Sequence, residues 1–85
     1  MNQEQIQEKL KAILKDMLNL DQTILDGLAP DTDLIEKLTL SSIDAIELIV
    51  IVERDFGISI DDVDIGKELV QTLETLSSKI MEVSS

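Results

Sequence analysis

Apolar side chains in three stretches of this chain recur at steps of three and four residues, the spacing of one face of an α-helix. The first stretch predicts a helix over residues 3–18, with the stripe Ile6, Leu10, Ile13, Leu14, Met17 and Leu18. The second predicts a helix over residues 42–56 that ends at Gly57, a residue suited to the position after a helix. The third predicts a helix after Thr72, which can cap it, with the stripe Leu73, Leu76, Ile80 and Met81.

The segments between these helices are predicted to be ordered and packed against them. Residues 19–41 contain Gly27 and the only proline, Pro30, but also eight leucines and isoleucines, and a connection this long is usually ordered. We expect one helical turn at 34–38, a short extended piece at 58–60 and a short helix at 64–69. The prediction is one all-α domain over residues 1–85, a small antiparallel bundle of three long helices and one short helix.

The charge distribution is more informative than the size. Residues 1–20 carry three basic and three acidic side chains, so residues 21–85, with four basic and 15 acidic ones, carry the entire net charge of −11. Such a surface is a poor partner for nucleic acid and for anionic membranes, and a good one for basic patches on other proteins. The alternative is that the acidity only maintains solubility.

Several classes of protein are disfavoured by what the sequence contains. The start of the chain is polar, unlike a secretory signal, and the longest apolar run, residues 48–52, is far too short to cross a bilayer. The chain has no cysteine, so it forms neither disulfides nor thiolate metal sites, which fits a reducing compartment. We expect a monomeric cytoplasmic protein without a resident metal.

The helix over residues 42–56 has more apolar surface than one core stripe needs. One arc of its wheel collects the core residues Ala45, Leu48, Ile49, Val52 and Phe56. Elsewhere around it lie Ile43, Ile46, Val50 and Ile51, interleaved with the charged residues Asp44, Glu47, Glu53 and Arg54. This second face predicts a docking surface, apolar and ringed by acids; a central helix buried all round is the alternative.

Two serines, Ser41 and Ser42, stand at the start of this helix. Because the chain has no histidine and no cysteine, neither serine can be the nucleophile of a histidine-assisted catalytic site. Ser41 with Asp44 three residues later predicts an N-cap related to the capping box. An anion on Ser42 would lie at a helix N-terminus, where unpaired N–H groups and the helix dipole favour negative charge.

These residues belong to a longer pattern. The stretch DLIEKLTLSSIDAIEL at residues 33–48, followed by ERDFGI at 53–58, resembles the acyl carrier protein family. The family pattern is a Leu-Gly approach, then Asp-Ser-Leu, an acid and a Glu-Leu pair, with Phe-Gly-Ile after an acidic stretch. Length, helix order and the acid-rich turn at 61–64 agree as well, so the resemblance covers nearly the whole chain.

The resemblance implies a non-catalytic carrier. A covalent 4′-phosphopantetheine arm on Ser42, installed from coenzyme A by a phosphopantetheinyl transferase, would hold acyl groups as thioesters for acyl-transferring or condensing enzymes. Register selects Ser42, because Ser42 is followed by Ile43 and Asp44 as the family serine is followed by leucine and an acid. The acids would meet basic patches on these enzymes, so the implied partner-binding residues are Ser41, Ile43, Asp44, Ile46, Glu47, Val50, Glu53 and Arg54.

Three departures from the family pattern indicate a specialised member. Ser41 replaces the aspartate before the modified serine, Thr39 replaces the glycine of the approach, and Arg54 stands where an acid is common. The carrier would serve fatty acid biosynthesis or a related polyketide or specialised lipid pathway. A stand-alone peptidyl or aminoacyl carrier and an unmodified acidic interaction module remain alternatives.

Two further classes are weaker. A calcium loop with Gly66 at its sixth position would require acids where Val63 and Ile65 stand, so the EF-hand pattern fails. An enzyme would have to rely on carboxylates, lysines and serines, and no pair of these is placed in an evident pocket.

Overall fold

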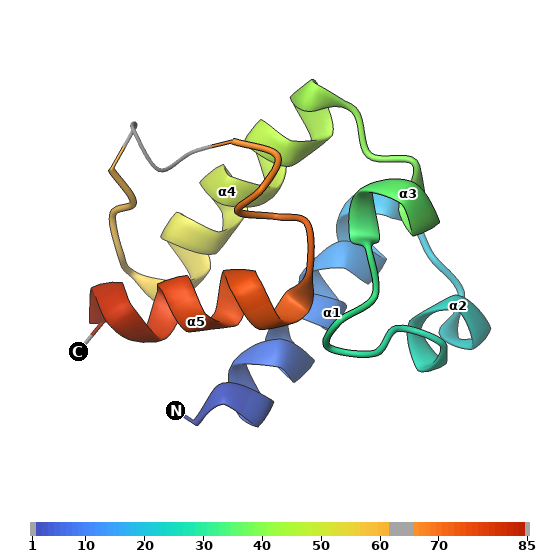
Figure 1. The fold of residues 1–85 in the computed structure, drawn as a ribbon, viewed down its shortest axis with the longest axis horizontal. Helices are drawn as coiled ribbons and strands as arrows, with labels where there is room; N and C mark the ends of the chain where they lie inside the picture. Colours follow the sequence, from blue (N-terminus) through green and yellow to red (C-terminus); the bar gives the residue numbers. More distant parts are fainter. Residues whose placement is uncertain (1, 62–65, 85) are drawn as a thin grey trace.

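The computed structural model describes residues 2–61 and 66–84, and it folds as a bundle of helices (Figure 1). The long helices are α1 (Gln3–Leu18), α4 (Ser42–Phe56) and α5 (Leu73–Ser84), and two one-turn helices, α2 (Gln22–Asp26) and α3 (Leu34–Leu38), lie between α1 and α4. Helix α1 packs against both α4 and α5, and the two run back against its direction. The all-α prediction and the bounds of the first two long helices are confirmed.

The ends of the helices follow local chemistry. Asn2 caps α1 through a reciprocal capping box with Gln5, and Ser41 caps α4 in the same way. Gly57 ends α4 in the left-handed conformation, with φ of 66°, as its position in the sequence predicts. Thr72 accepts a hydrogen bond from the Thr75 N–H in the first turn of α5. These contacts satisfy amide groups that have no partner within the helices.

The core is built almost entirely of aliphatic side chains from all parts of the chain. Its buried members are Ile6, Leu10, Ile13, Leu14, Leu25, Leu28, Leu34, Leu40, Ala45, Leu48, Ile49, Val52, Ile60, Leu69, Val70, Leu73, Leu76 and Ile80. Phe56, the only aromatic residue, is half-buried at the edge, with the Lys9 ammonium 4.6 Å from its ring centre. One continuous core therefore holds the three long helices and the connections together.

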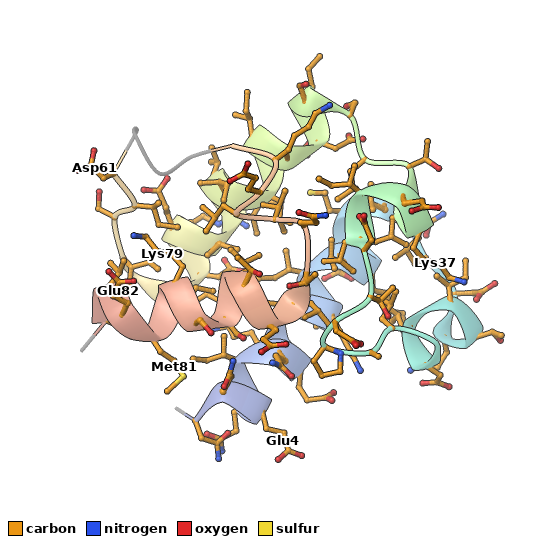
Figure 2. All side chains as sticks on the ribbon, viewed as in Figure 1. Glu4, Lys37, Asp61, Lys79, Met81 and Glu82 are labelled. Atoms are coloured by element: carbon orange, nitrogen blue, oxygen red, sulfur yellow. The ribbon has the colours of Figure 1, made fainter. Side chains whose placement is uncertain are left out.

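The stripe of α5 differs at one position from its prediction. Met81 is 38% exposed and lies outside the core (Figure 2), whereas Ser77 is fully buried. The Ser77 hydroxyl accepts hydrogen bonds from the side-chain amides of Gln3 and Gln7 and donates to the Glu74 carbonyl. Because these bonds satisfy the buried hydroxyl, Ser77 takes a place in the buried stripe of α5 beside Leu73, Leu76 and Ile80, and Met81 does not.

The connection from residue 19 to 41 is packed down, as predicted, and contains one helix more than predicted. Helix α3 confirms the expected turn, while α2 has too few residues to show a period in the sequence. Two backbone hydrogen bonds fasten the connection to the far end of the chain: Leu34 N–H donates to the Gln71 carbonyl at 2.7 Å, and Glu74 N–H donates to the Pro30 carbonyl at 2.9 Å.

The helix expected at 64–69 lies partly on residues outside the described ranges. Its described part is a turn in which the N–H groups of Leu69, Val70 and Gln71 donate to the carbonyls three residues earlier. Leu69 and Val70 are buried, so this turn is anchored in the core. Among the helices of the two described ranges, none has both the length and the apolar character needed to cross a membrane.

Candidate functional site

The two serines at the start of α4 have different surroundings. The Ser41 hydroxyl oxygen accepts a hydrogen bond from the Asp44 N–H at 3.1 Å, and the Asp44 carboxylate accepts one from the Ser41 N–H at 3.0 Å. This reciprocal capping box confirms the role of Ser41 that the sequence predicts. The Ser41 hydroxyl thus caps the N-terminus of α4.

Ser42 is the first residue of α4 and its side chain is exposed. Its hydroxyl makes no hydrogen bond with any residue that the structure describes. The amides of Ser42 and Ile43 belong to the first turn, whose N–H groups point out of the helix end and have no partner further back. Ser42 therefore offers an accessible hydroxyl at the positive end of a 15-residue helix dipole.

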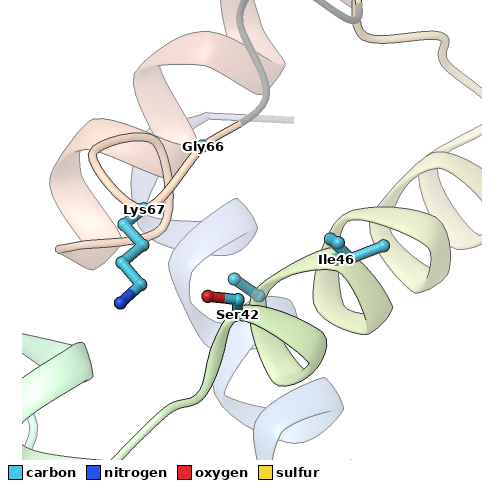
Figure 3. Close-up of a pocket in the computed structure, with 5 residues that line it drawn as sticks. Ser42, Ile46, Gly66 and Lys67 are labelled. Atoms are coloured by element: carbon cyan, nitrogen blue, oxygen red, sulfur yellow. The ribbon is translucent and has the colours of Figure 1, made fainter.

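A cavity of about 210 Å³ adjoins this hydroxyl, and its described lining residues are Ser42, Ala45, Ile46, Gly66 and Lys67. It lies between the first two turns of α4 and the turn at 66–70 (Figure 3). Ala45 and Ile46 supply apolar wall, and Lys67 lines the cavity from the opposite segment. The site thus combines an exposed hydroxyl, a small apolar hollow and a cation.

The outward face of α4 is open to solvent beside this cavity. Ile43 is 75% exposed, Ile46 56% and Val50 57%, values far from those of a helix buried all round. Glu47 is also exposed. The predicted apolar face therefore exists on the surface, and the alternative of a fully buried central helix is wrong. Single exposed apolar residues are common, but three along one helix beside a candidate site suit a contact surface.

The charged residues of α4 are less uniform than the sequence suggests. The Asp44 carboxylate is engaged in the cap, and the half-buried Glu53 carboxylate accepts a hydrogen bond from the Ile60 N–H at 2.9 Å. The Arg54 side chain is exposed and pairs with Asp55 at 3.2 Å. Glu53 thus fastens the loop after α4, a contact that sequence spacing does not reveal.

Lys67 is the site residue that sequence reasoning did not identify. It is 25 positions from Ser42 in the sequence, and no local pattern links the two. The turn bonds and the burial of Leu69 and Val70 bring it to the cavity. A general base for the Ser42 hydroxyl is absent among the described lining residues, and within residues 2–61 and 66–84 no group of three metal-ligating side chains is found. The arrangement suits a hydroxyl that is modified by another protein.

Comparison with known proteins gives one consistent result. A family model described as the phosphopantetheine attachment site matches residues 8–80. An acyl carrier protein from Thermosynechococcus vestitus is 37% identical over 82 residues, which cover 94% of this chain and 98% of the relative. Acyl carrier proteins from Picosynechococcus sp. (34% identical; 91% and 89% covered) and Nitratidesulfovibrio vulgaris (36% identical; 75% and 80% covered) are also similar.

Proposed function

We propose that this chain, which belongs to the phosphopantetheine attachment-site family, carries its 4′-phosphopantetheine arm on Ser42. It is a non-catalytic acyl carrier of fatty acid biosynthesis, which holds acyl groups as thioesters on the covalent arm. The carrier interacts with a phosphopantetheinyl transferase and with acyl-handling enzymes. The observation that supports Ser42 most strongly is the division between the serines: one hydroxyl caps the helix, and its neighbour is exposed beside a cavity.

The residues at the start of α4 fit a phosphodiester. Ser42 presents an exposed hydroxyl at a helix N-terminus, where the first-turn N–H groups and the dipole favour an anion. The 4′-phosphopantetheine supplies a thiol, which this cysteine-free chain does not have. The cavity beside Ser42 and the cation of Lys67 suit a chain that begins with a phosphate.

The attachment step needs another protein. The Ser42 Oγ forms a new bond to the phosphorus of coenzyme A that bears the pantetheine, and the pyrophosphate bond breaks to release adenosine 3′,5′-bisphosphate. The hydroxyl proton goes to a base of the transferase, because the described residues that line the cavity beside Ser42 include no carboxylate and no histidine. Ser42 is therefore the acceptor in a reaction whose acid–base groups lie in the partner.

We propose the exposed face of α4 as the docking surface for these enzymes. Ile43, Ile46 and Val50 supply apolar contact, and Glu47 supplies charge for basic patches. The capping and loop contacts of Asp44 and Glu53 hold these carboxylates at fixed positions beside the apolar residues. Arg54 offsets the charge of Asp55 at the far end of α4, so this end of the surface is less acidic than it would be with an acid at position 54.

The departures from the family pattern alter charge more than backbone. Ser41 keeps the cap that an aspartate would form, without the charge. Thr39 adopts φ of 53°, the left-handed region that a glycine favours, so the approach to Ser42 follows a course that glycine would suit. We infer that a specialised role of this carrier depends on which enzymes accept the altered charge around Ser42 and Arg54.

Intact mass tests the attachment residue. The purified chain, incubated with coenzyme A and a phosphopantetheinyl transferase, gains the mass of one phosphopantetheine, and Ser42→Ala abolishes this gain. Ser41→Ala is the matched control, because it removes the neighbouring hydroxyl and still gains the mass. Modification that persists in Ser42→Ala would contradict the proposal, and a wild-type chain that stays unmodified would favour an unmodified interaction module.

A further inference from the structure

A cation in the cavity beside the candidate attachment point lies on a different segment of the chain. Lys67, on the turn at 66–70, lines the same cavity as Ser42 (Figure 3). It is exposed and forms no ion pair with any other residue within the two described ranges. Lys67 is one of seven basic residues in a chain with 18 acidic ones, and it lines the cavity beside Ser42.

Lys67 is held at this place by its own turn. The Val70 N–H donates to the Lys67 carbonyl at 3.2 Å, and the Leu69 N–H donates to the Gly66 carbonyl at 3.2 Å. Leu69 and Val70 are both buried, and the Gln71 carbonyl accepts the Leu34 N–H at 2.7 Å. The backbone that carries Lys67 is therefore fixed to the core and to α3, while its side chain reaches the cavity.

We propose that Lys67 is a positioning residue for the modified serine: its ammonium pairs with the phosphodiester on Ser42 and holds the start of the arm against the cavity. The proposal rests on the attachment of 4′-phosphopantetheine to Ser42. Lysine binds phosphate oxygens as a point charge, and its flexible stem allows it to follow the group that it pairs with. The first turn of α4 attracts the same anion from the opposite side.

The arrangement restricts the arm without burying it. An exposed ion pair contributes little energy, so the phosphodiester alternates between a state paired with Lys67 and a state open to solvent. In the paired state the arm begins between α4 and the 66–70 turn, next to Ala45 and Ile46. Lys67 thereby biases the direction in which the arm leaves the protein.

A thermodynamic cycle isolates this contact. Urea unfolding of the unmodified and modified forms is compared in the wild type and in Lys67→Gln, and the difference between the two modification effects gives the coupling. We expect modification to raise the folded-to-unfolded ratio by about 1.5- to 5-fold more in the wild type than in Lys67→Gln, the range of exposed ion pairs. Lys67→Arg keeps the coupling, and Lys15→Gln, an exposed lysine on α1, leaves it unchanged.

The phosphorus NMR signal of the modified protein supplies a second, direct measurement. Raising sodium chloride to 1 M, where the Debye length is about 3 Å, shifts this resonance as the pair dissociates. In Lys67→Gln the resonance already lies at its high-salt position. A modification effect that is equal in the wild type and Lys67→Gln, or a resonance that does not respond to salt, overturns the proposal.

These outcomes are separate from a failure of the proposed function. Intact mass is recorded first on every sample, so a chain that carries no arm on Ser42 refutes the attachment site itself. A chain that carries the arm on Ser42 and shows no coupling to Lys67 refutes only the positioning role. Because Lys67 is exposed, its substitution is expected to leave the fold intact.

Discussion

The clearest test of the two serine roles is the substitution Ser41→Ala, which removes the cap of α4 and leaves Ser42 in place. The lost contact is the hydrogen bond that the Ser41 hydroxyl accepts from the Asp44 N–H at 3.1 Å. Replacing an N-cap serine by alanine costs about 0.5–2 kcal/mol. Because the freed Asp44 amide can bond water at this exposed site, we expect a loss of about 1 kcal/mol in the free energy of unfolding.

Thermal unfolding of the unmodified protein, followed by circular dichroism, measures this loss. For a domain of this size, about 1 kcal/mol lowers Tm by about 4–8 °C. Ser41→Asp is the matched control, because aspartate caps a helix as well as serine does and Tm stays near the wild-type value. Ser42→Ala also leaves Tm nearly unchanged, since the Ser42 hydroxyl has no hydrogen bond among the described residues and alanine favours helices.

The two variants should therefore show opposite losses: Ser41→Ala loses stability and keeps modification, and Ser42→Ala keeps stability and loses modification. The reasoning is refuted if Ser42→Ala lowers Tm as much as Ser41→Ala does. It is equally refuted if Ser41→Ala leaves Tm unchanged, because the capping contact would then contribute nothing to the fold.

Two other substitutions test the approach to the site and its docking surface. Thr39→Gly relieves a left-handed conformation that costs a side-chain-bearing residue about 1–2 kcal/mol, against about 0.5–1 kcal/mol for the extra backbone entropy of glycine. We expect urea unfolding to show a net gain of about 0.5–1 kcal/mol in the free energy of unfolding. The converse change, Gly57→Ala at φ of 66°, lowers the free energy of unfolding. A loss in Thr39→Gly contradicts the strain argument. Ile46→Ala, at a residue 56% exposed, changes stability by less than about 0.5 kcal/mol and raises the KM of the transferase. Leu48→Ala, at a fully buried residue, is the control that lowers the free energy of unfolding, by about 2–5 kcal/mol. An unaltered KM in Ile46→Ala excludes Ile46 from docking.

The sequence predicts most accurately the features that depend on local chemistry or on long periods. The bounds of α1 follow from its apolar stripe, and those of α4 follow from its stripe and from Ser41 and Gly57 next to its ends. The exposed face of α4 follows from the number of apolar residues on it, because one core stripe cannot bury them all. The capping role of Ser41 is also predictable from the sequence, because its contact with Asp44 lies only three residues away.

Features that are very short, or that depend on contacts between residues far apart in the sequence, are not predictable in this way. Helix α2 has one turn and shows no period. Glu53 was expected on the docking surface, and only the structure shows that its carboxylate accepts the Ile60 N–H. Lys67 lines the same cavity as Ser42 because buried residues anchor its turn, and the sequence alone does not show where that turn packs. Burial of Ser77 likewise depends on glutamines from α1.

Positive charge lies beside Ser42 although the chain as a whole is acidic. A phosphodiester adds negative charge to a chain whose net charge is already −11, but acids beyond the Debye length of about 8 Å at physiological salt contribute little. The Asp44 carboxylate accepts the Ser41 N–H, while the helix end and Lys67, which lines the cavity beside Ser42, are positive. The same surface can therefore accept a phosphate at Ser42 and present acids to basic partners along α4. Positive charge lies at the start of α4 and acidic charge lies along it. The acids can therefore attract a basic partner while the phosphate stays bound at Ser42.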